Sequence, residues 1–205
     1  MANEYAFSMV IQAGGQSTRM GQDKALMPFL GQPLIERVVK RLLGSADELL
    51  ITTNHPEAFT SLNLPLVPDL IPGRGALGGL YTALAASRGA VVAVVACDMP
   101  FVRPDLLLAQ RDLLLHEAVD VVVPWSPEGL EPLHAVYRRE TCLPVVEAAL
   151  QAGERKVISW YGAVKVREMS QQEVALIDPQ FRSFININRP EEFQAAEKLA
   201  RTLEP

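Results

Sequence analysis

A glycine-rich, basic stretch near the amino end of the chain could hold a phosphate group. Gly14 and Gly15 follow an apolar run at residues 7–11, and Arg19 and Lys24 come shortly afterwards. Glycines leave backbone N–H groups open to the approach of a large anion. Arginine binds phosphate oxygens through two parallel hydrogen bonds, and lysine adds a point charge. These residue types in this order predict a triphosphate-binding loop.

This stretch differs from the Walker phosphate-binding loop, in which a lysine directly follows the last glycine. Here Gln22 and Asp23 separate Gly21 from Lys24. A surface loop with solvated charges is the alternative interpretation. Position favours the phosphate site, because open α/β sheets bind ligands at the carboxyl ends of their strands.

Asp98 is a second candidate, since it follows the strongest apolar run of the chain, residues 90–96. Burying an unpaired carboxylate at the end of such a strand would be costly. Magnesium prefers oxygen ligands and often uses one or two carboxylates together with substrate phosphates. Asp98 is therefore a candidate magnesium ligand. A cap for the helix after Pro104, or plain surface exposure, is the alternative.

Asp69 ends a short apolar segment just ahead of a glycine-rich stretch, residues 73–79. A carboxylate can accept hydrogen bonds from both N1–H and the 2-amino group of guanine, a donor pair that adenine and cytosine lack. A turn aspartate beside Pro68 is the alternative. The glycines that follow also match the dinucleotide-binding pattern Gly-x-Gly-x-x-Gly. Prolines interrupt the approach to them, which disfavours a Rossmann dehydrogenase.

The elements that must position these residues alternate between strands and helices. Apolar patterning predicts strands at residues 7–11, 48–52, 64–67, 90–96, 119–123, 133–137 and 184–188. It predicts helices at residues 33–43, 78–87, 104–116, 143–152 and 190–202. This alternation predicts an α/β fold, a single α/β/α domain of three layers around a mostly parallel sheet.

Composition excludes several classes of protein. The chain has 205 residues, of which 49% are hydrophobic and 21% charged, as is typical of a soluble globular enzyme. A net charge of −5 argues against nucleic acid or an anionic membrane as the main partner. No apolar run approaches the roughly 20 residues that span a bilayer, and the first residues do not resemble an export signal. Cys97 and Cys142 are predicted to be free thiols of a cytoplasmic protein.

The stretch AGGQSTRMGQDK, residues 13–24, resembles the signature of the molybdenum cofactor guanylyltransferase family. Cytidylyl-transferring relatives carry Ala-Ala-Gly, so the paired Gly14 and Gly15 favour the guanylyl branch. Gln12 stands where the family has leucine. Ala76 and Gly78 replace the proline and alanine of a second family motif, which predicts a looser loop there.

The resemblance implies a Rossmann-like nucleotidyltransferase that transfers GMP from GTP to molybdopterin, with Mg²⁺ as cofactor. The nucleotide-binding half would be about residues 6–100, and the second-substrate half about residues 101–205. The implied catalytic residues are Arg19, Lys24 and Asp98, with Asp98 as the metal ligand. The implied GTP-binding residues are Gln12, Ala13, Gly14, Gly15, Lys24, Asp69 and Asp98. The implied molybdopterin-binding residues are Arg155, Lys156, Asn186 and Asn188.

Further partners that the resemblance implies are proteins that insert molybdenum or receive the finished cofactor, and a monomer is expected. One alternative function is a cytidylyltransferase or sugar-phosphate nucleotidyltransferase of the same fold. The other is a binding module that holds the nucleotide or cofactor without catalysis. The joint presence of Arg19, Lys24 and Asp98 argues against a pure binder, which needs no metal at the α-phosphate.

Overall fold

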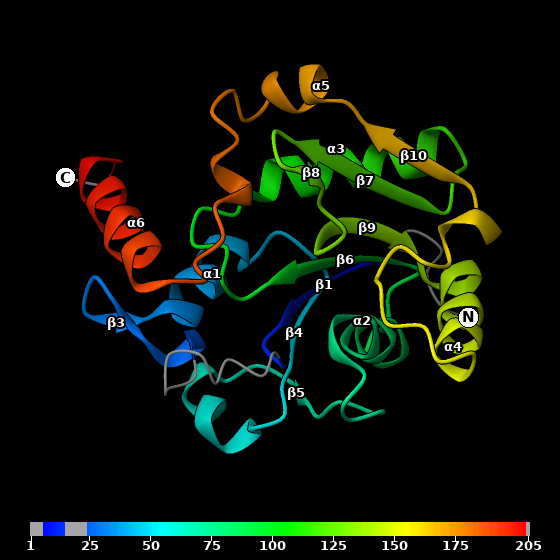
Figure 1. Cartoon of the computed structure of the whole chain (residues 1–205), viewed down its shortest axis with the longest axis horizontal. Helices are drawn as coiled ribbons and strands as arrows, with labels where there is room; N and C mark the ends of the chain where they lie inside the picture. Colours follow the sequence, from blue (N-terminus) through cyan, green and yellow to red (C-terminus); the bar gives the residue numbers. More distant parts are fainter. Residues whose placement is uncertain (1–5, 15–23, 204–205) are drawn as a thin grey trace.

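An eight-stranded sheet forms the centre of the computed structural model, which describes residues 6–14 and 24–203 (Figure 1). Its strand order is β10-β7-β9-β6-β1-β4-β5, and β8 pairs with β7 beside this path. The strands are β1 (Phe7–Gln12), β4 (Glu48–Thr52), β5 (Leu66–Val67), β6 (Val91–Ala96), β7 (Val121–Ser126), β8 (Gly129–Leu130), β9 (His134–Arg138) and β10 (Val166–Met169). A separate hairpin joins β2 (Pro28–Phe29) to β3 (Gln32–Pro33).

Most neighbouring strands of the sheet are parallel. β1 lies between β4 and β6, parallel to both, and β5 continues this arrangement beside β4. The exception within the path is β9, which is antiparallel to both β6 and β7. Val91 to Val95 are fully buried, as expected for a strand that is covered on both faces. The predicted fold class, a mostly parallel α/β/α sheet, is confirmed.

Helices cover both faces of the sheet (Figure 1). Met9 and Ile11 of β1 pack on one face with residues of α1 (Leu34–Leu42), α3 (Pro104–His116) and α5 (Gln171–Ala175). Val10 points to the other face, with α2 (Gly75–Ala86) and α4 (Arg139–Gln151). This alternation follows from the two-residue period of a strand. Short 3₁₀ helices are η2 (Lys24–Leu26), η3 (Pro56–Leu62), η4 (Tyr161–Ala163) and η5 (Arg182–Phe184).

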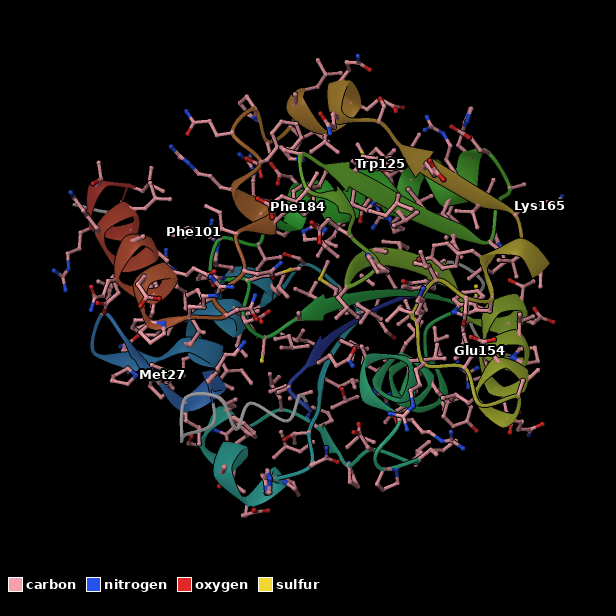
Figure 2. All side chains as sticks on the ribbon, in the orientation of Figure 1. Met27, Phe101, Trp125, Glu154, Lys165 and Phe184 are labelled. Carbon is pink, nitrogen blue, oxygen red and sulfur yellow. The ribbon has the colours of Figure 1, made fainter. Side chains whose placement is uncertain are left out.

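A third apolar cluster lies at the edge of the domain, beneath the C-terminal helix α6 (Pro190–Leu203). Phe29 of the hairpin packs edge-to-face against Phe101, with ring centroids 6.4 Å apart, and against Phe193 of α6, at 5.5 Å. Ile187, just before α6, is fully buried in the same cluster. Figures 1 and 2 show α6 beside the hairpin, with Met27 and Phe101 in this part of the molecule. Through this cluster, the C-terminal part of the chain packs against the segments that follow Lys24 and Asp98.

The helices predicted at residues 33–43, 104–116 and 190–202 and the strand at residues 48–52 are confirmed within two residues. The strand predicted at residues 184–188 is wrong. Both edges of β6, the strand whose end this segment meets, are already paired with β1 and β9. The segment instead contributes one hydrogen bond beyond the strand end, from the Ile187 N–H to the Asp98 carbonyl oxygen at 3.1 Å.

Three other boundaries differ from the prediction. α2 begins at Gly75 and α4 at Arg139, each several residues before the predicted start. Pro144 lies inside α4 near its beginning, where a proline removes a single intrahelical hydrogen bond. β7 extends to Ser126 instead of ending at Val123, because β10 pairs with it as far as Pro124 and β8 pairs with Trp125 and Ser126. None of the helices in the described ranges is long and apolar enough to cross a membrane.

Candidate active site

Four neighbouring parallel strands, β5, β4, β1 and β6, place their carboxyl ends at one edge of the sheet. A cavity of about 370 Å³ opens at this edge. Predicted site residues from five segments of the chain line it: Gln12, Ala13, Gly14, Lys24, Asp69, Asp98 and Arg155. Gly15 and Arg19 lie outside the described residues. The structure therefore brings the described nucleotide-binding candidates to a single cavity.

Lys24 and Asp98 form the charged centre of this cavity. Lys24 Nζ lies 3.4 Å from Asp98 Oδ2, and the two side chains are 15% and 19% exposed. Lys24 Nζ also donates a hydrogen bond to Asn188 Oδ1 at 2.8 Å. Asn188 precedes α6, so residues from the beginning, middle and end of the chain meet here. We call this group the Lys24–Asp98 centre.

The environment of Asp98 favours a cation. Burial raises the pKa of the Asp98 carboxyl above its ordinary value, and the charge of Glu192 adds to this increase. The Lys24 ammonium group lowers the same pKa and offsets part of the effect. Asp98 Oδ1 is buried and accepts no hydrogen bond from any described residue. A buried oxygen with unused acceptor capacity is a suitable ligand for a positive charge.

A magnesium ion fits these residues. The described residues contain no group of three or more histidine, cysteine, aspartate or glutamate side chains that could hold a metal. Magnesium does not require such a cage, because it commonly binds one or two carboxylates together with substrate phosphates and water. Asp98, with one unpartnered buried oxygen at the mouth of the cavity, meets that requirement.

A second group of residues, which we call the Asp69 pocket, lies at the tips of β1, β4 and β5. Asn54 Nδ2 donates to Asp69 Oδ2 at 3.0 Å and to the carbonyl oxygen of Gly14 at 3.2 Å. Asp69 Oδ1 is buried without a partner among the described residues. Burial raises the pKa of the Asp69 carboxyl, and the bond from Asn54 opposes the change. The pocket holds a carboxylate with one free oxygen for an incoming donor.

Gly14 passes close to Asp69. A Cβ atom at this position would lie 3.1 Å from Asp69 Oδ2 and 3.5 Å from Asn54 Nδ2. The approach to the carboxylate is tighter than ordinary van der Waals contact, so a larger residue would require Asp69 to shift by a few tenths of an ångström.

Asn54 was not a candidate from the sequence. The signal that could have identified it is its position, two residues after β4, at the same sheet edge as the other candidates. The sequence shows it only as part of a polar turn, Asn54-His55-Pro56.

Gln12 fixes the beginning of α2 against the end of β1. Its Nε2 atom donates to the carbonyl oxygen of Ala76 at 3.2 Å. A Cβ atom on Gly79 would come within 1.8 Å of that nitrogen, so any other residue there would move the Gln12 side chain from this position. The close approach brings Gly75 and Ala76, at the start of α2, to the cavity wall. The prediction of a looser loop is wrong, because Ala76 and Gly78 belong to the first turns of α2.

The molybdopterin-binding candidates differ in their relation to the cavity. Arg155 lines the cavity, and Asn188 contacts Lys24. Lys156 is exposed and Asn186 half-buried, and neither is among the residues that line the cavity.

Other reactive side chains of the chain have structural surroundings. The Cys142 thiol is buried, and burial raises its pKa to about 12, which suppresses its thiolate. His134 is fully buried, and burial lowers its pKa to about 4, so it is neutral at physiological pH. Trp160 packs against Tyr137 and Tyr161, with ring centroids 6.0 and 5.0 Å away. These residues belong to the packing of the domain.

Comparisons with known proteins agree with this geometry. The model of the MobA-like NTP transferase domain matches residues 9–166. A probable molybdenum cofactor guanylyltransferase of Pelotomaculum thermopropionicum is 38% identical over 93% of this chain and 92% of its own length. A molybdenum cofactor guanylyltransferase of Desulfosudis oleivorans is 34% identical over 94% of this chain and 95% of its own.

Among solved structures, molybdopterin-guanine dinucleotide biosynthesis protein A of Archaeoglobus fulgidus superposes with a TM-score of 0.83. The alignment has 25% identity and covers 95% of this chain and 99% of that one. The chain therefore belongs to the MobA-like NTP transferase family, among the relatives of the molybdenum cofactor guanylyltransferases.

Proposed function

We propose that the chain transfers GMP from GTP to molybdopterin and releases pyrophosphate, so that molybdopterin guanine dinucleotide is formed. The observation that carries this proposal is the 3.4 Å pair of Lys24 and Asp98 in the same cavity as Asp69. The groups proposed to bind the phosphates, the metal and the base thus line the same cavity. Relatives named as molybdenum cofactor guanylyltransferases, aligned over nearly the whole chain, support the same reaction.

The transfer requires positioning and charge stabilisation more than a protein nucleophile. A terminal phosphate oxygen of molybdopterin attacks the α-phosphorus of GTP, one P–O bond forms, and the bond to the bridging oxygen of pyrophosphate breaks. The attacking phosphate is largely ionised at neutral pH, so no general base is needed. Lys24 would stabilise charge on the departing pyrophosphate, together with Arg19 and the backbone donors of Gly14 and Gly15. Asp98 would hold Mg²⁺, which when bound offsets negative charge on the phosphates.

Guanine selection is assigned to the Asp69 pocket. Asn54 takes one acceptor position of Asp69 Oδ2, so the buried Oδ1 atom and the second lone pair of Oδ2 are left to accept two donors from the base. Guanine offers N1–H and the 2-amino group on one edge, and cytosine and adenine lack this pair. Leaving such a buried acceptor unpaired would penalise the wrong base.

Arg155 and Asn188 are the proposed contacts to molybdopterin, since Arg155 lines the cavity and Asn188 contacts Lys24, which also lines it. Lys156 and Asn186 are proposed as more distant members of the same surface. The cytoplasm, a monomeric state, and partners that insert molybdenum or receive the cofactor stay predictions from the sequence.

The decisive experiment incubates the protein with molybdopterin, Mg²⁺ and each nucleoside triphosphate in turn, and analyses the products by mass spectrometry. The expected product is molybdopterin guanine dinucleotide, formed with GTP and accompanied by pyrophosphate. A cytidylyl adduct, or transfer to a sugar phosphate in a parallel panel, would contradict the proposal. Nucleotide binding without any product would indicate a binding module.

The metal assignment is tested separately. Asp98→Asn is expected to raise the Mg²⁺ concentration that half-saturates the reaction and to leave the melting temperature almost unchanged. Asp105→Asn, on the exposed beginning of α3, is the matched control. An unchanged Mg²⁺ titration for Asp98→Asn would contradict the assignment.

A further inference from the structure

Glu192, in the first turn of α6, folds back onto the segment that leads into the active site. Its Oε2 atom accepts hydrogen bonds from the backbone N–H groups of Asn188, at 2.6 Å, and Arg189, at 3.0 Å. The neighbouring Glu191 is exposed, whereas Glu192 is half-buried. The carboxylate therefore fixes the backbone of Asn188, the residue whose side chain reaches Lys24.

These contacts connect Glu192 to the metal-binding candidate through a short series of residues. Asn188 Oδ1 accepts from Lys24 Nζ at 2.8 Å, and the same nitrogen lies 3.4 Å from Asp98 Oδ2. The Lys24 ammonium group is thus divided between two acceptors, and the shorter contact is the one to Asn188. The adjacent Ile187 N–H donates to the Asp98 carbonyl oxygen. Together, Ile187 and Asn188 therefore contact both the backbone of Asp98 and the Lys24 ammonium group, which would compete with a metal ion for the Asp98 carboxylate.

Glu192 also acts on Asp98 through space. Its negative charge acts on the Asp98 carboxyl and makes the surroundings of Asp98 more attractive to positive charge. Loss of Glu192 would remove this contribution. It would also release Asn188, so that Lys24 would turn to Asp98 as its remaining partner among the described residues.

We propose that Glu192 is a positioning residue that holds Lys24 on Asn188 and so keeps the Asp98 carboxylate available to a divalent cation. This inference rests on the proposed function, in which Asp98 is the metal ligand. It assigns to the C-terminal helix a part in metal binding, although α6 does not line the cavity.

The test measures binding in the absence of molybdopterin, so that catalysis is not involved. Affinity for a fluorescent GTP analogue is determined with Mg²⁺ and with EDTA, and the ratio of the two dissociation constants reports the contribution of the metal. Glu192→Ala, which removes both the acceptor and the charge, is expected to reduce this ratio on the order of 5-fold or more. Glu192→Gln retains an acceptor oxygen and is expected to give a smaller reduction. Glu191→Gln, one residue away, should match the wild type.

The role of Lys24 is tested by combining substitutions. Glu192→Ala is then introduced into a Lys24→Met background. There, the change in the logarithm of the ratio is expected to be less than about half of the change that Glu192→Ala causes in the wild type, since no Lys24 ammonium group remains to be held away from Asp98. Equal reductions with and without Lys24 would overturn the positioning role. So would wild-type ratios in both Glu192 variants.

Two further measurements distinguish the positioning role from a loss of stability and from a wrong metal assignment. Melting temperatures show whether a variant is merely less stable, and Glu192→Gln provides the answer if Glu192→Ala does not fold. A wild-type protein whose GTP affinity is the same with Mg²⁺ and with EDTA would remove the metal assignment itself. A different outcome is a wild-type protein that binds GTP more tightly with Mg²⁺ and Glu192 variants that show the same ratio. That outcome would overturn only the role of Glu192.

Discussion

The Asp69 pocket and the Lys24–Asp98 centre share one cavity but are built in different ways. The Asp69 pocket takes Gly14, Asn54 and Asp69 from the tips of three adjacent parallel strands, so the sheet alone fixes its geometry. The Lys24–Asp98 centre depends on Asn188, which is 164 residues from Lys24 along the chain. Asn188 directly precedes α6, which packs against the β2–β3 hairpin through Phe193 and Phe29.

The difference suggests a division between selection and chemistry. The proposed base-recognition site lies where main-chain pairing continues past the strand ends, as from the Ala13 N–H to the Thr52 carbonyl oxygen at 2.7 Å. The proposed phosphate site depends on tertiary contacts between segments far apart in the sequence. Substitutions in the two groups should therefore affect different measurements, and four predictions test this separation.

The largest effect is expected at the Lys24–Asp98 centre. Lys24→Ala should reduce turnover on the order of 100-fold or more, because it removes an electrostatic stabiliser of the departing pyrophosphate. The preference for GTP over CTP and ATP should stay unchanged, since the Asp69 pocket is intact. Turnover and nucleotide preference are measured by pyrophosphate release, with Lys40→Ala on the exposed face of α1 as the control. A rate within threefold of the wild type would show that the phosphate-binding residues are misassigned.

The opposite pattern is expected from Asp69→Ala. Discrimination between GTP and other triphosphates should fall roughly 10- to 100-fold, the range for loss of hydrogen bonds to a charged acceptor. Maximal turnover with saturating GTP should change much less, because Lys24 and Asp98 are untouched. Competition between GTP and ATP in one reaction measures the preference directly. If selectivity survives, another group reads the base and the proposed division is wrong.

The sequence predicted the two groups unequally well, for the same structural reason. Asp98 and Asp69 follow apolar segments, and the rule that ligands bind at the carboxyl ends of parallel strands was enough to place them together. Asn54 has no such mark, because one amide in a polar turn is indistinguishable from many surface amides. The contact between Asn188 and Lys24 depends on how α6 docks, which helical periodicity does not specify.

Prediction of the fold from the sequence was limited in the same way. Continuous apolar runs such as residues 90–96 identified buried strands, and capping and periodicity identified α1, α3 and α6. The antiparallel insertion of β9 between β6 and β7 was not predicted, because strand order depends on tertiary packing. The apolar pattern at residues 184–188 reflects burial of Ile187 under α6 instead of strand pairing.

A smaller effect is expected from Asn54→Ala, which sharpens the definition of the Asp69 pocket. Asn54 holds one oxygen of Asp69 and does not itself read the base, so its loss should reduce guanine preference by only roughly 2- to 10-fold, about 0.4 to 1.4 kcal/mol. The change should appear in the preference and not in maximal turnover. His55→Ala, in the same turn and exposed, is the matched control. Equal effects of the two substitutions would indicate a general disturbance of the turn.

The smallest effect is expected on the molybdopterin side, where the contacts are exposed and contributed by a loop. Arg155→Ala should raise the KM for molybdopterin by about 2- to 5-fold, because an exposed charge contact contributes little after solvent screening. The KM for GTP should stay unchanged. Lys156→Ala is the control, since Arg155 lines the cavity and Lys156 does not.

If the two variants behave alike, the basic segment acts through its overall charge, and raising the salt concentration should abolish both effects. If only Arg155→Ala raises the KM, a specific contact at the cavity wall is indicated, and the acceptor side then has a fixed residue comparable to Asp69 on the guanine side.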